Sequence, residues 1–110
     1  MNKVVLITGG ARGIGSAIAL ELAKHGYDIV INYLTSKQPA KELKEKIESQ
    51  YHVRCLTICA DVSDVDQVNI MVSEIEEKMG GVDILINNAA VDLSNLFHLK
   101  NAEEFKRTLD

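Results

Sequence analysis

The sequence of 110 residues predicts an α/β fold, in which helices cover both faces of a parallel sheet. Short apolar runs rich in β-branched residues alternate along the chain with longer amphipathic stretches. Such alternation is typical of strands that are joined by right-handed helical crossovers. A glycine-rich turn lies between the first apolar run and the first amphipathic stretch, which is typical of the first β-α-β unit of these sheets.

The first apolar run, residues 4–7, predicts a strand that is buried on both faces. The glycine-rich turn over residues 9–15 follows it. Apolar residues then recur every four positions, which predicts the buried face of a helix. These residues are Ile14, Ile18 and Leu22. Gly26 is placed to end this helix, and residues 27–33 predict the second strand.

A highly charged stretch over residues 39–50 predicts the second helix. Its apolar residues share one helical face, and Pro39 is suited to the first turn of a helix. The residues of that face are Ala40, Leu43 and Ile47. Residues 52–60 then predict the third strand, because apolar and β-branched side chains dominate this run.

Ser63 and Asp66 have the spacing of a capping box, which predicts the start of a third helix. Its apolar stripe contains Val65, Val68, Val72, Ile75 and Met79. The glycine pair at 80–81 is expected to end the helix, and residues 82–86 predict the fourth strand. From residue 101 onward the pattern indicates the beginning of a fourth helix.

The predicted order is therefore β-α-β-α-β-α-β, followed by an unfinished helix. A sheet of four strands that ends on the apolar run 82–86 would leave an apolar edge strand uncovered. We therefore expect these residues to be the front portion of a larger doubly wound domain.

Composition excludes several classes of protein. Lys and Arg total 12 against 16 for Asp and Glu, which gives a net charge of −4 and no basic footprint for nucleic acid or an anionic membrane. Apolar residues make up 46% of the chain, as in ordinary globular domains. We find no apolar run of the ~18 residues that span a bilayer and no signal peptide, so the prediction is a cytoplasmic protein.

The two cysteines, Cys55 and Cys59, lie four residues apart on the third predicted strand. Four residues of a strand span about 13 Å, whereas a disulfide requires Cα atoms within roughly 7 Å. We therefore expect no bridge between them, and we expect both to pack as small apolar residues. No further ligands for a metal ion lie nearby in the sequence.

The turn over residues 9–15 carries the clearest chemical signal. Glycines allow a tight turn and bring backbone N–H groups close to a pyrophosphate, and the helix N-terminus adds the positive end of its dipole. Gly15, inside the predicted helix, allows that helix to pack closely against the strand. The alternative is a glycine-rich turn of purely structural purpose.

The spacing of this turn is T-G-x-x-x-G-x-G, and here the sequence resembles the short-chain dehydrogenase/reductase family. The run Asn87-Asn88-Ala89-Ala90 is similar to the N-N-A-G motif of that family, and Asp61-Val62 follows the third strand, where the family contacts adenine. Within the family, the sequence is most similar to bacterial 3-oxoacyl-[acyl-carrier-protein] reductases. The resemblance covers the family's amino-terminal portion, so residues 1–110 are expected to form the amino-terminal part of one NAD(P)-binding Rossmann domain.

The resemblance assigns binding roles residue by residue. The residues expected to cradle the pyrophosphate and the adenosine ribose are Gly9, Arg12, Gly13, Ile14 and Gly15. Asp61 would accept a hydrogen bond from the adenine amino group, and Val62 would contact the ring. The residues expected along the ribose and nicotinamide are Asn88, Ala89 and Ala90, the last of which replaces the family's usual glycine. Asn87 is expected to tie neighbouring strands together.

The choice of nicotinamide cofactor depends on the end of the second strand. NAD-binding proteins place a carboxylate there to hold the ribose diol, but this strand ends in Asn32 and Tyr33. Arg12 and Lys37 supply positive charge that would pair with a 2′-phosphate. The prediction is therefore NADP in preference to NAD, with Asn32 and Lys37 added to the cofactor-binding residues.

The catalytic Ser, Tyr and Lys of the family, and a supporting Asn, correspond to positions after residue 110. No catalytic residue is therefore assigned, and these 110 residues alone are expected to be inactive. One pair, Tyr33 and Lys37, has the Y-x-x-x-K spacing of the family. However, it straddles the end of a strand and a loop instead of lying on one helix face, so we expect Tyr33 to pack at the strand end.

The function that the resemblance implies is NADPH-dependent reduction of a ketone to an alcohol, with an acyl-carrier-bound or small-molecule carbonyl substrate. A sugar or polyol remains an alternative substrate. Two other classes also remain open, namely a nucleotide-binding module without chemistry and a truncated remnant without function. The full-length relatives are expected to be homo-oligomers, with no nucleic-acid or membrane partner.

Overall fold

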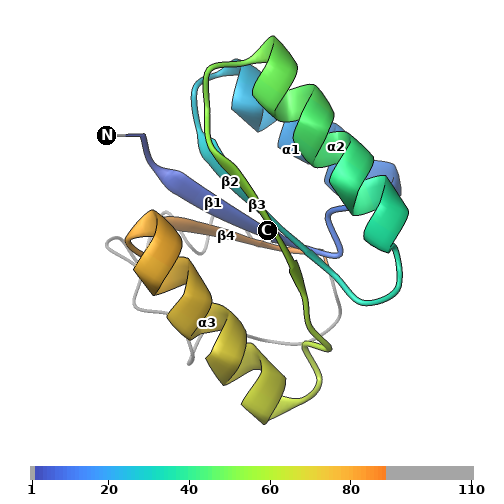
Figure 1. Cartoon of the computed structure of the whole chain (residues 1–110), viewed down its shortest axis with the longest axis vertical. Helices are drawn as coiled ribbons and strands as arrows, with labels where there is room; N and C mark the ends of the chain where they lie inside the picture. The colour runs from blue at the N-terminus through green and yellow to red at the C-terminus, as the bar shows by residue number, and fades with distance from the viewer. Residues whose placement is uncertain (1, 89–110) are drawn as a thin grey trace.

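The computed structural model describes residues 2–88, in which four strands and three helices alternate (Figure 1). The elements are β1 (Val4–Thr8), α1 (Gly13–Lys24), β2 (Asp28–Tyr33), α2 (Lys37–Gln50), β3 (Cys55–Cys59), α3 (Val65–Met79) and β4 (Ile84–Asn87). Neighbouring strands are all parallel, in the order β3-β2-β1-β4. The predicted α/β class is confirmed, whereas the helix predicted from residue 101 lies outside the described residues.

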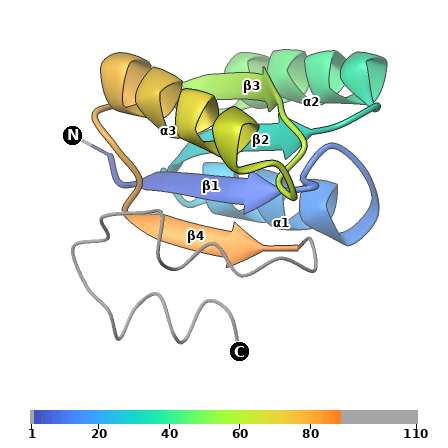
Figure 2. The same ribbon diagram turned by 90° about the horizontal axis from the view of Figure 1, so that it is seen from below.

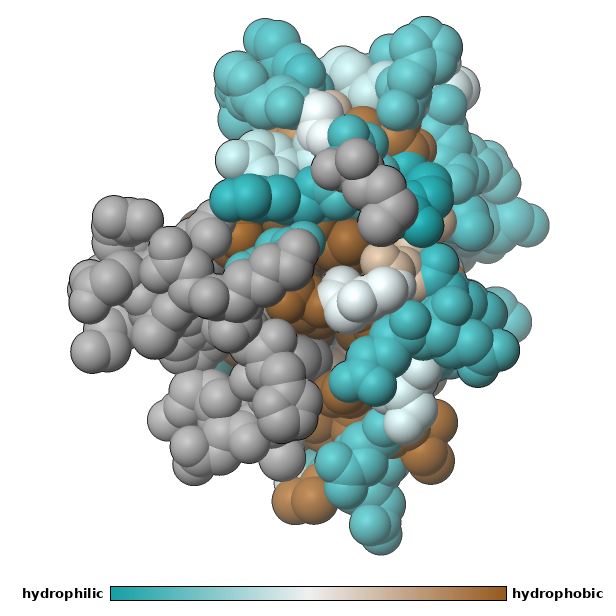
Figure 3. Space-filling model, turned by 90° about the vertical axis from the view of Figure 1, so that its left-hand side faces the viewer, coloured by the Kyte–Doolittle hydropathy of each residue, from teal (hydrophilic) through white to brown (hydrophobic). Residues whose placement is uncertain are grey.

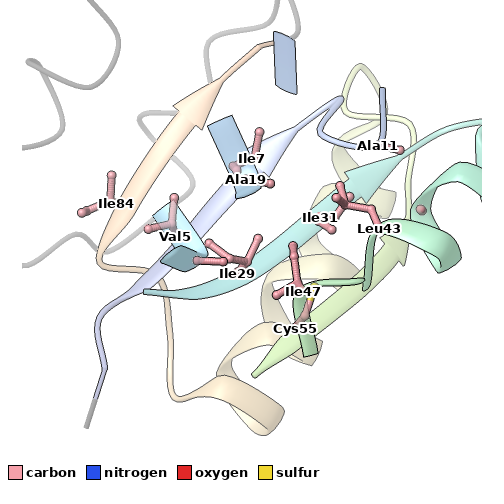
Figure 4. Close-up of a cluster of buried hydrophobic side chains, with 12 residues drawn as sticks. Val5, Ile7, Ala11, Ala19, Ile29, Ile31, Leu43, Ile47, Cys55 and Ile84 are labelled. Carbon is pink, nitrogen blue, oxygen red and sulfur yellow. The ribbon is translucent and has the colours of Figure 1, made fainter. Parts of the chain in front are cut away.

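The sheet separates two helical layers. Helices α1 and α2 cover one face, and α3 covers the other (Figures 1 and 2). The side chains of β1 and β2 alternate between the two faces, so Val5 and Ile7 pack under α1 and α2 while Leu6 packs under α3. Figure 4 shows the cluster under α1 and α2, in which Ile47 of α2 lies close to Cys55 of β3. Burial on both faces is the physical reason for the continuous apolar runs in the sequence.

In the view of Figure 3, apolar residues are visible near the centre of the surface, and polar residues lie above them and to their right. Within the described part of the chain, no helix is long and apolar enough to cross a membrane.

Helix α1 buries a different stripe from the predicted one. Ile14 is 74% exposed and Ile18 and Leu22 are half-buried, so the prediction that they form the buried face is wrong in its orientation. The buried residues of α1 are Gly15, Ala19 and Ala23. They also recur every four positions, one residue further along. Small side chains bring the helix axis close to the sheet, and the larger residues then pack at its flank.

Helix α3 begins one residue later than a cap at Ser63 would place it. Asp64 is the N-cap, and its carboxylate accepts hydrogen bonds from the backbone N–H groups of Asp66 (3.0 Å) and Gln67 (3.3 Å). The predicted capping box between Ser63 and Asp66 is therefore wrong, because the Ser63 hydroxyl donates to Asp61 instead. The predicted end is confirmed, since Gly80 ends α3 in a left-handed conformation with φ of 84°.

The two cysteines have different surroundings. Both are free thiols, as predicted, but Cys55 is buried and Cys59 is exposed. The prediction that both pack as small apolar residues is therefore wrong for Cys59, whose thiol lies 3.4 Å from the carbonyl oxygen of Leu34 at the end of the strand. Burial raises the pKa of the Cys55 thiol to about 12.

A buried ionic group fastens the amino ends of β2 and β3. Asp28 is 2% exposed, and its carboxylate accepts hydrogen bonds from the Arg54 guanidinium at 2.7 and 2.9 Å, from the Arg54 backbone N–H and from Asn2. Burial raises the pKa of Asp28, but the Arg54 and Asn2 hydrogen bonds and the Arg54 charge outweigh it, so that the pKa lies below its usual value. Strand β3 begins directly after Arg54, at Cys55, whereas the sequence predicted a start at residue 52.

Candidate functional site at the carboxyl edge of the sheet

The carboxyl ends of all four parallel strands meet at one edge of the sheet (Figure 2). From β1, the chain builds outward through β2 to β3, and it then returns to place β4 on the opposite side of β1. The connections therefore reverse direction between β1 and β4. In open α/β sheets, ligands bind outside the carboxyl ends of the strands at such a reversal. The glycine-rich loop that follows β1 lies at this position.

The loop has a shape that only glycine permits. Gly9 has φ of 63° and Gly13 has φ of 57°, both in the left-handed region. A Cβ atom on Gly15 would lie 2.7 Å from the carbonyl oxygen of Gly9 and 2.8 Å from the Cα atom of Gly10. By contrast, a Cβ atom on Gly13 would meet nothing within 4 Å. The start of α1 is thus packed against the loop at Gly15 and open in front of Gly13.

Polar side chains from β1 and β4 tie this edge together. The Thr8 hydroxyl, which is fully buried, donates to the Asn87 side-chain oxygen at 3.0 Å and accepts the backbone N–H of Asn88 at 3.0 Å. The Asn88 side chain donates to the carbonyl oxygen of Gly9 at 3.2 Å. The prediction that Asn87 ties neighbouring strands together is confirmed.

The N-terminus of α1 lacks a protein cap. Its N-cap residue, Arg12, makes no side-chain capping bond, and no acidic residue lies in the first turn. The first N–H groups of a helix have no partner within the helix, and they carry the positive end of its dipole. Such an end is suited to a phosphate or another anion, and the open space in front of Gly13 leaves room for one to approach.

A pocket of about 170 Å³ opens between the glycine-rich loop and the segment that connects β2 to α2. Its lining residues are Gly9, Ala11, Arg12, Tyr33, Leu34, Thr35 and Ser36. None of them is acidic, and Arg12 brings a positive charge. Lys37 is the first residue of α2, directly after Ser36, and the first turn of α2 also contains no acid. The pocket is therefore suited to an anionic group beside a flat ring or sugar.

Asp61 and Val62 follow β3 on the far side of this edge. The Asp61 carboxylate accepts hydrogen bonds from the Ser63 hydroxyl (2.6 Å) and the Ser63 backbone N–H (2.9 Å). These bonds hold the pKa of Asp61 below its usual value, so the group is ionised at neutral pH and able to accept. Val62 is half-buried against the cluster under α3.

The structure brings most of the predicted cofactor residues to this one edge. Gly9 and Arg12 line the pocket, Lys37 adjoins it, and Asn88 contacts the loop. Asn32 is placed differently: it is 3% exposed, and its side chain is bonded within the protein. The predicted residues Ala89 and Ala90 lie outside the described residues.

Sequence reasoning missed the part of the pocket that β2 and its following segment supply. Leu34, Thr35 and Ser36 line it, and none of them was predicted. Ser36 precedes a charged helical stretch, which is a typical N-cap position, and this signal could have placed it at a helix start. Tyr33 packs against the cluster under α1 and α2, as expected for a strand-end residue, and also lines the pocket.

A larger hollow of about 530 Å³ lies at the opposite edge of the sheet, where Asn2, Asp28 and Arg54 line it with His52 and Val53. Its charged groups already bond to one another in the network that fastens β2 to β3. Size alone therefore does not make it the better candidate. Among residues 2–88, no group of three or more His, Cys, Asp or Glu side chains is arranged to hold a metal ion.

Comparison with known proteins agrees with the geometry of the carboxyl edge. Residues 3–110 match the sequence pattern of the family described as short chain dehydrogenase. The chain belongs to this family. A curated relative is the 3-oxoacyl-[acyl-carrier-protein] reductase FabG of Staphylococcus aureus (strain Mu50), which is 38% identical over the whole chain. The alignment covers 44% of that reductase, so the chain spans less than half the length of this relative.

Solved structures of the family share the fold of this chain. A short chain dehydrogenase from Burkholderia cenocepacia, in complex with NADP, is 43% identical with a TM-score of 0.74, and the match covers 81% of this chain and 36% of that one. L-sorbose reductase from Gluconobacter frateurii, complexed with NADPH and L-sorbose, is 36% identical with a TM-score of 0.75. That match covers 82% of this chain and 34% of the sorbose reductase.

Proposed function

We propose that this chain supplies the cofactor-binding portion of an NADPH-dependent reductase that converts a ketone into an alcohol. The observation that carries the proposal is the pocket between the glycine-rich loop and the start of α2, which contains Arg12 and no acidic residue. NADPH supplies a hydride when it is bound. In the overall reaction that hydride is added to the carbonyl carbon, and a proton is added to the carbonyl oxygen.

The preference for NADP rests on charge at the tip of β2. A carboxylate at this tip would hold the ribose diol of NAD and repel a 2′-phosphate. Tyr33 occupies the tip, Arg12 lines the pocket, and Lys37 directly follows its lining residue Ser36. A hydrogen bond to a charged group contributes roughly 1.5–3 kcal/mol. One such cation would favour the phosphorylated ribose by about tenfold, and the two together by about a hundredfold or more.

The other predicted residues account for the rest of the adenosine half. The uncapped N–H groups at the start of α1, from Gly13 to Gly15, would hold the pyrophosphate. Asp61 would accept a hydrogen bond from the adenine amino group, and Val62 would contact the ring. The predicted contacts of Asn88, Ala89 and Ala90 with the ribose and nicotinamide remain proposals.

For the substrate, the similarity to FabG favours a 3-oxoacyl thioester bound to an acyl carrier protein. The similarity to L-sorbose reductase favours the alternative class, a sugar or polyol. A cytoplasmic location and assembly into a homo-oligomer belong to the same proposal. Incubation of the whole protein with NADPH and either a 3-oxoacyl thioester or L-sorbose would distinguish the two substrate classes.

The cofactor proposal is tested directly with fragments of the cofactor. Adenosine 2′,5′-bisphosphate carries the 2′-phosphate of NADP, and ADP carries the diphosphate alone. We would measure both dissociation constants by isothermal titration calorimetry for the parent chain, Arg12→Ala and Lys37→Ala. Lys46→Ala is the matched control, because it removes the same charge from an exposed position further along α2.

The expected result is saturable binding of both nucleotides by the parent. Arg12→Ala and Lys37→Ala should each lower the affinity for adenosine 2′,5′-bisphosphate by about tenfold, since each removes one charge-assisted contact. The affinity for ADP should stay nearly unchanged. Lys46→Ala should behave as the parent. Equal affinity of the parent for the two nucleotides would contradict the NADP preference, and binding of neither would contradict the cofactor site itself.

A further inference from the structure

One buried amide connects two parts of the candidate site that are distant in sequence. Asn32 lies one residue before the end of β2 and is 3% exposed. Its side-chain oxygen accepts the backbone N–H of Gly9 at 3.3 Å, and its side-chain nitrogen donates to the carbonyl oxygen of Ala60 at 3.0 Å. Its own backbone carbonyl accepts the N–H of Gly10 at 3.0 Å.

The two partners of this amide belong to opposite sides of the site. Gly9 begins the glycine-rich loop, and Ala60 directly precedes Asp61 after the end of β3. Because β2 lies between β1 and β3 in the sheet, a side chain on β2 is the shortest link between the segments that follow its two neighbours. Asn32 thus fixes the loop and the start of the β3–α3 connection relative to one another.

These contacts also change which loop N–H groups can bind a ligand. The N–H groups of Gly9 and Gly10 are both directed at Asn32, so they are already used within the protein. The N–H groups at the uncapped start of α1 are not used in this way and can bind an anion. Asn32 therefore holds Gly9 and Gly10 within the protein, and the N–H groups at the start of α1 are the ones that would face the ligand.

We propose that Asn32 is a positioning residue for the cofactor, which acts through Gly9 and Ala60 without touching the nucleotide. This inference rests on the proposed function, because it concerns the affinity of the same site. It replaces the direct cofactor contact that the sequence predicted for Asn32 with an indirect role. Its consequence is that loss of the amide weakens every adenosine nucleotide equally, with or without a 2′-phosphate.

The chemistry of the side chain explains why an amide is required. The position needs one acceptor for Gly9 and one donor for Ala60, at the two ends of a short planar group. Asn32→Asp keeps the acceptor but turns a second oxygen toward the Ala60 carbonyl oxygen. Asn32→Leu has the same branched arrangement of side-chain heavy atoms and satisfies neither partner. A buried N–H or C=O that loses its partner is costly, so the segments that carry these groups must move.

The experiment compares Asn32→Asp and Asn32→Leu with the parent chain and with Asp28→Asn. Asp28 is the matched control, because it is a buried polar residue at the opposite end of the same strand, and its hydrogen bonds lie in the amino-edge network. Calorimetric titration with adenosine 2′,5′-bisphosphate and with ADP gives the affinities, at a temperature at which cooperative thermal unfolding shows each variant to be folded.

Both Asn32 variants should raise the dissociation constants of the two nucleotides by the same factor, about tenfold. The ratio of the two dissociation constants should therefore stay at the parental value. Asp28→Asn should lower the unfolding temperature but bind as the parent does. This pattern differs from that of Arg12→Ala, which changes the ratio. If Asn32→Leu does not unfold cooperatively, Asn32→Asp decides the result alone.

Parental affinity in the folded Asn32 variants would overturn the positioning role while leaving the proposed function intact. An equal loss of affinity in Asp28→Asn would also overturn it, because any buried polar change in β2 would then have the same effect. A change in the ratio of the two dissociation constants would show direct contact with the 2′-phosphate instead. Failure of the parent to bind either nucleotide would overturn the proposed function and this inference with it.

Discussion

The substitution Gly15→Ala tests the close packing of α1 against the glycine-rich loop. The added Cβ atom would lie 2.7 Å from the Gly9 carbonyl oxygen, about 0.7 Å short of ordinary contact at 3.4 Å. The nearest atoms belong to the backbone, which cannot rotate away as a flexible side chain could. The helix must therefore move away from the loop by several tenths of an ångström.

Two effects of this substitution oppose each other. Overpacking at a crowded position costs about 1–3 kcal/mol. Alanine returns up to about 1 kcal/mol relative to glycine within a helix. The net expectation is a loss of about 1–2 kcal/mol in the free energy of unfolding, measured by urea titration.

The same movement should weaken nucleotide binding. Hydrogen bonds from N–H groups to oxygen occupy a window only about 0.5 Å wide, from 2.7 to 3.2 Å. A displacement of this size moves the N–H groups at the start of α1 away from a phosphate whose nucleotide is placed by the neighbouring pocket. We expect the affinity for ADP to fall by about tenfold or more, measured by calorimetry.

Gly26→Ala is the control for Gly15→Ala. Gly26 lies just past α1 with φ of 90°, and an added Cβ atom would meet nothing within 4 Å. It should lose about 1–2 kcal/mol of stability through backbone strain alone, with nucleotide affinity unchanged. The packing argument would be refuted if Gly15→Ala were as stable as the parent chain and bound ADP within twofold of the parental affinity.

Three other predictions concern stability and reactivity. Asp28→Asn should lose about 1–3 kcal/mol at pH 7. The pKa of Asp28 is lower in the folded state than its unfolded value of about 3.9. Its contribution to stability is therefore present above the unfolded pKa and is lost as pH falls through the folded pKa. In urea titrations below about pH 4, the stability of Asp28→Asn should consequently fall less steeply with pH than that of the parent chain. Cys59 should react with Ellman's reagent in the native chain, whereas Cys55, with a pKa of about 12, should react only in urea; two reactive native thiols would contradict this. Asp64→Ala should cost about 1 kcal/mol of unfolding free energy through loss of the α3 cap, and an equal or larger loss in Ser63→Ala would contradict the cap assignment.

The order of elements could be predicted because strands and helices have different patterns of apolar residues in this sequence. Strands β1 and β2 consist largely of apolar residues, because they are buried on both faces. The later amphipathic stretches match α2 and α3, and the buried residues of α2 are the predicted ones. Helix α3 buries Val68, Ile75 and Met79 as predicted, but it also buries Met71, and the prediction is wrong for Val65, which is 61% exposed. The glycine-rich turn could be placed because it stands between a buried strand and a helical stripe.

The orientation of α1 could not be predicted from periodicity. Two stripes run along this helix with the same spacing, one of large residues beginning at Ile14 and one of small residues beginning at Gly15. Hydrophobicity favours the large stripe. The structure buries the small one, because the backbone of Gly9 and Gly10 lies too close to the start of α1 for a larger side chain at position 15. The distance between two elements is a tertiary property, and the helix sequence alone does not contain it.

The direction of the Asn32 side chain was equally beyond the sequence. A polar residue near the tip of a strand is expected to face the ligand, but the residues that line the pocket after β2 are Leu34, Thr35 and Ser36. Asn32 instead finds one donor and one acceptor inside the protein, on Gly9 and Ala60. Such a match depends on which strands are neighbours in the sheet, and this becomes known only once β2 is placed between β1 and β3.

The glycines of the loop therefore have different roles in the proposed site. The backbone of Gly9 is held at both of its polar groups, the N–H by Asn32 and the carbonyl oxygen by Asn88. Gly15 sets the distance between that rigid peptide and α1, and Gly13 leaves the space in front of the helix open. The proposed nucleotide would meet N–H groups already in position, so little of its binding energy would be used to order the loop. Substitutions of the supporting groups should consequently change the affinity for a nucleotide even where they touch none of its atoms.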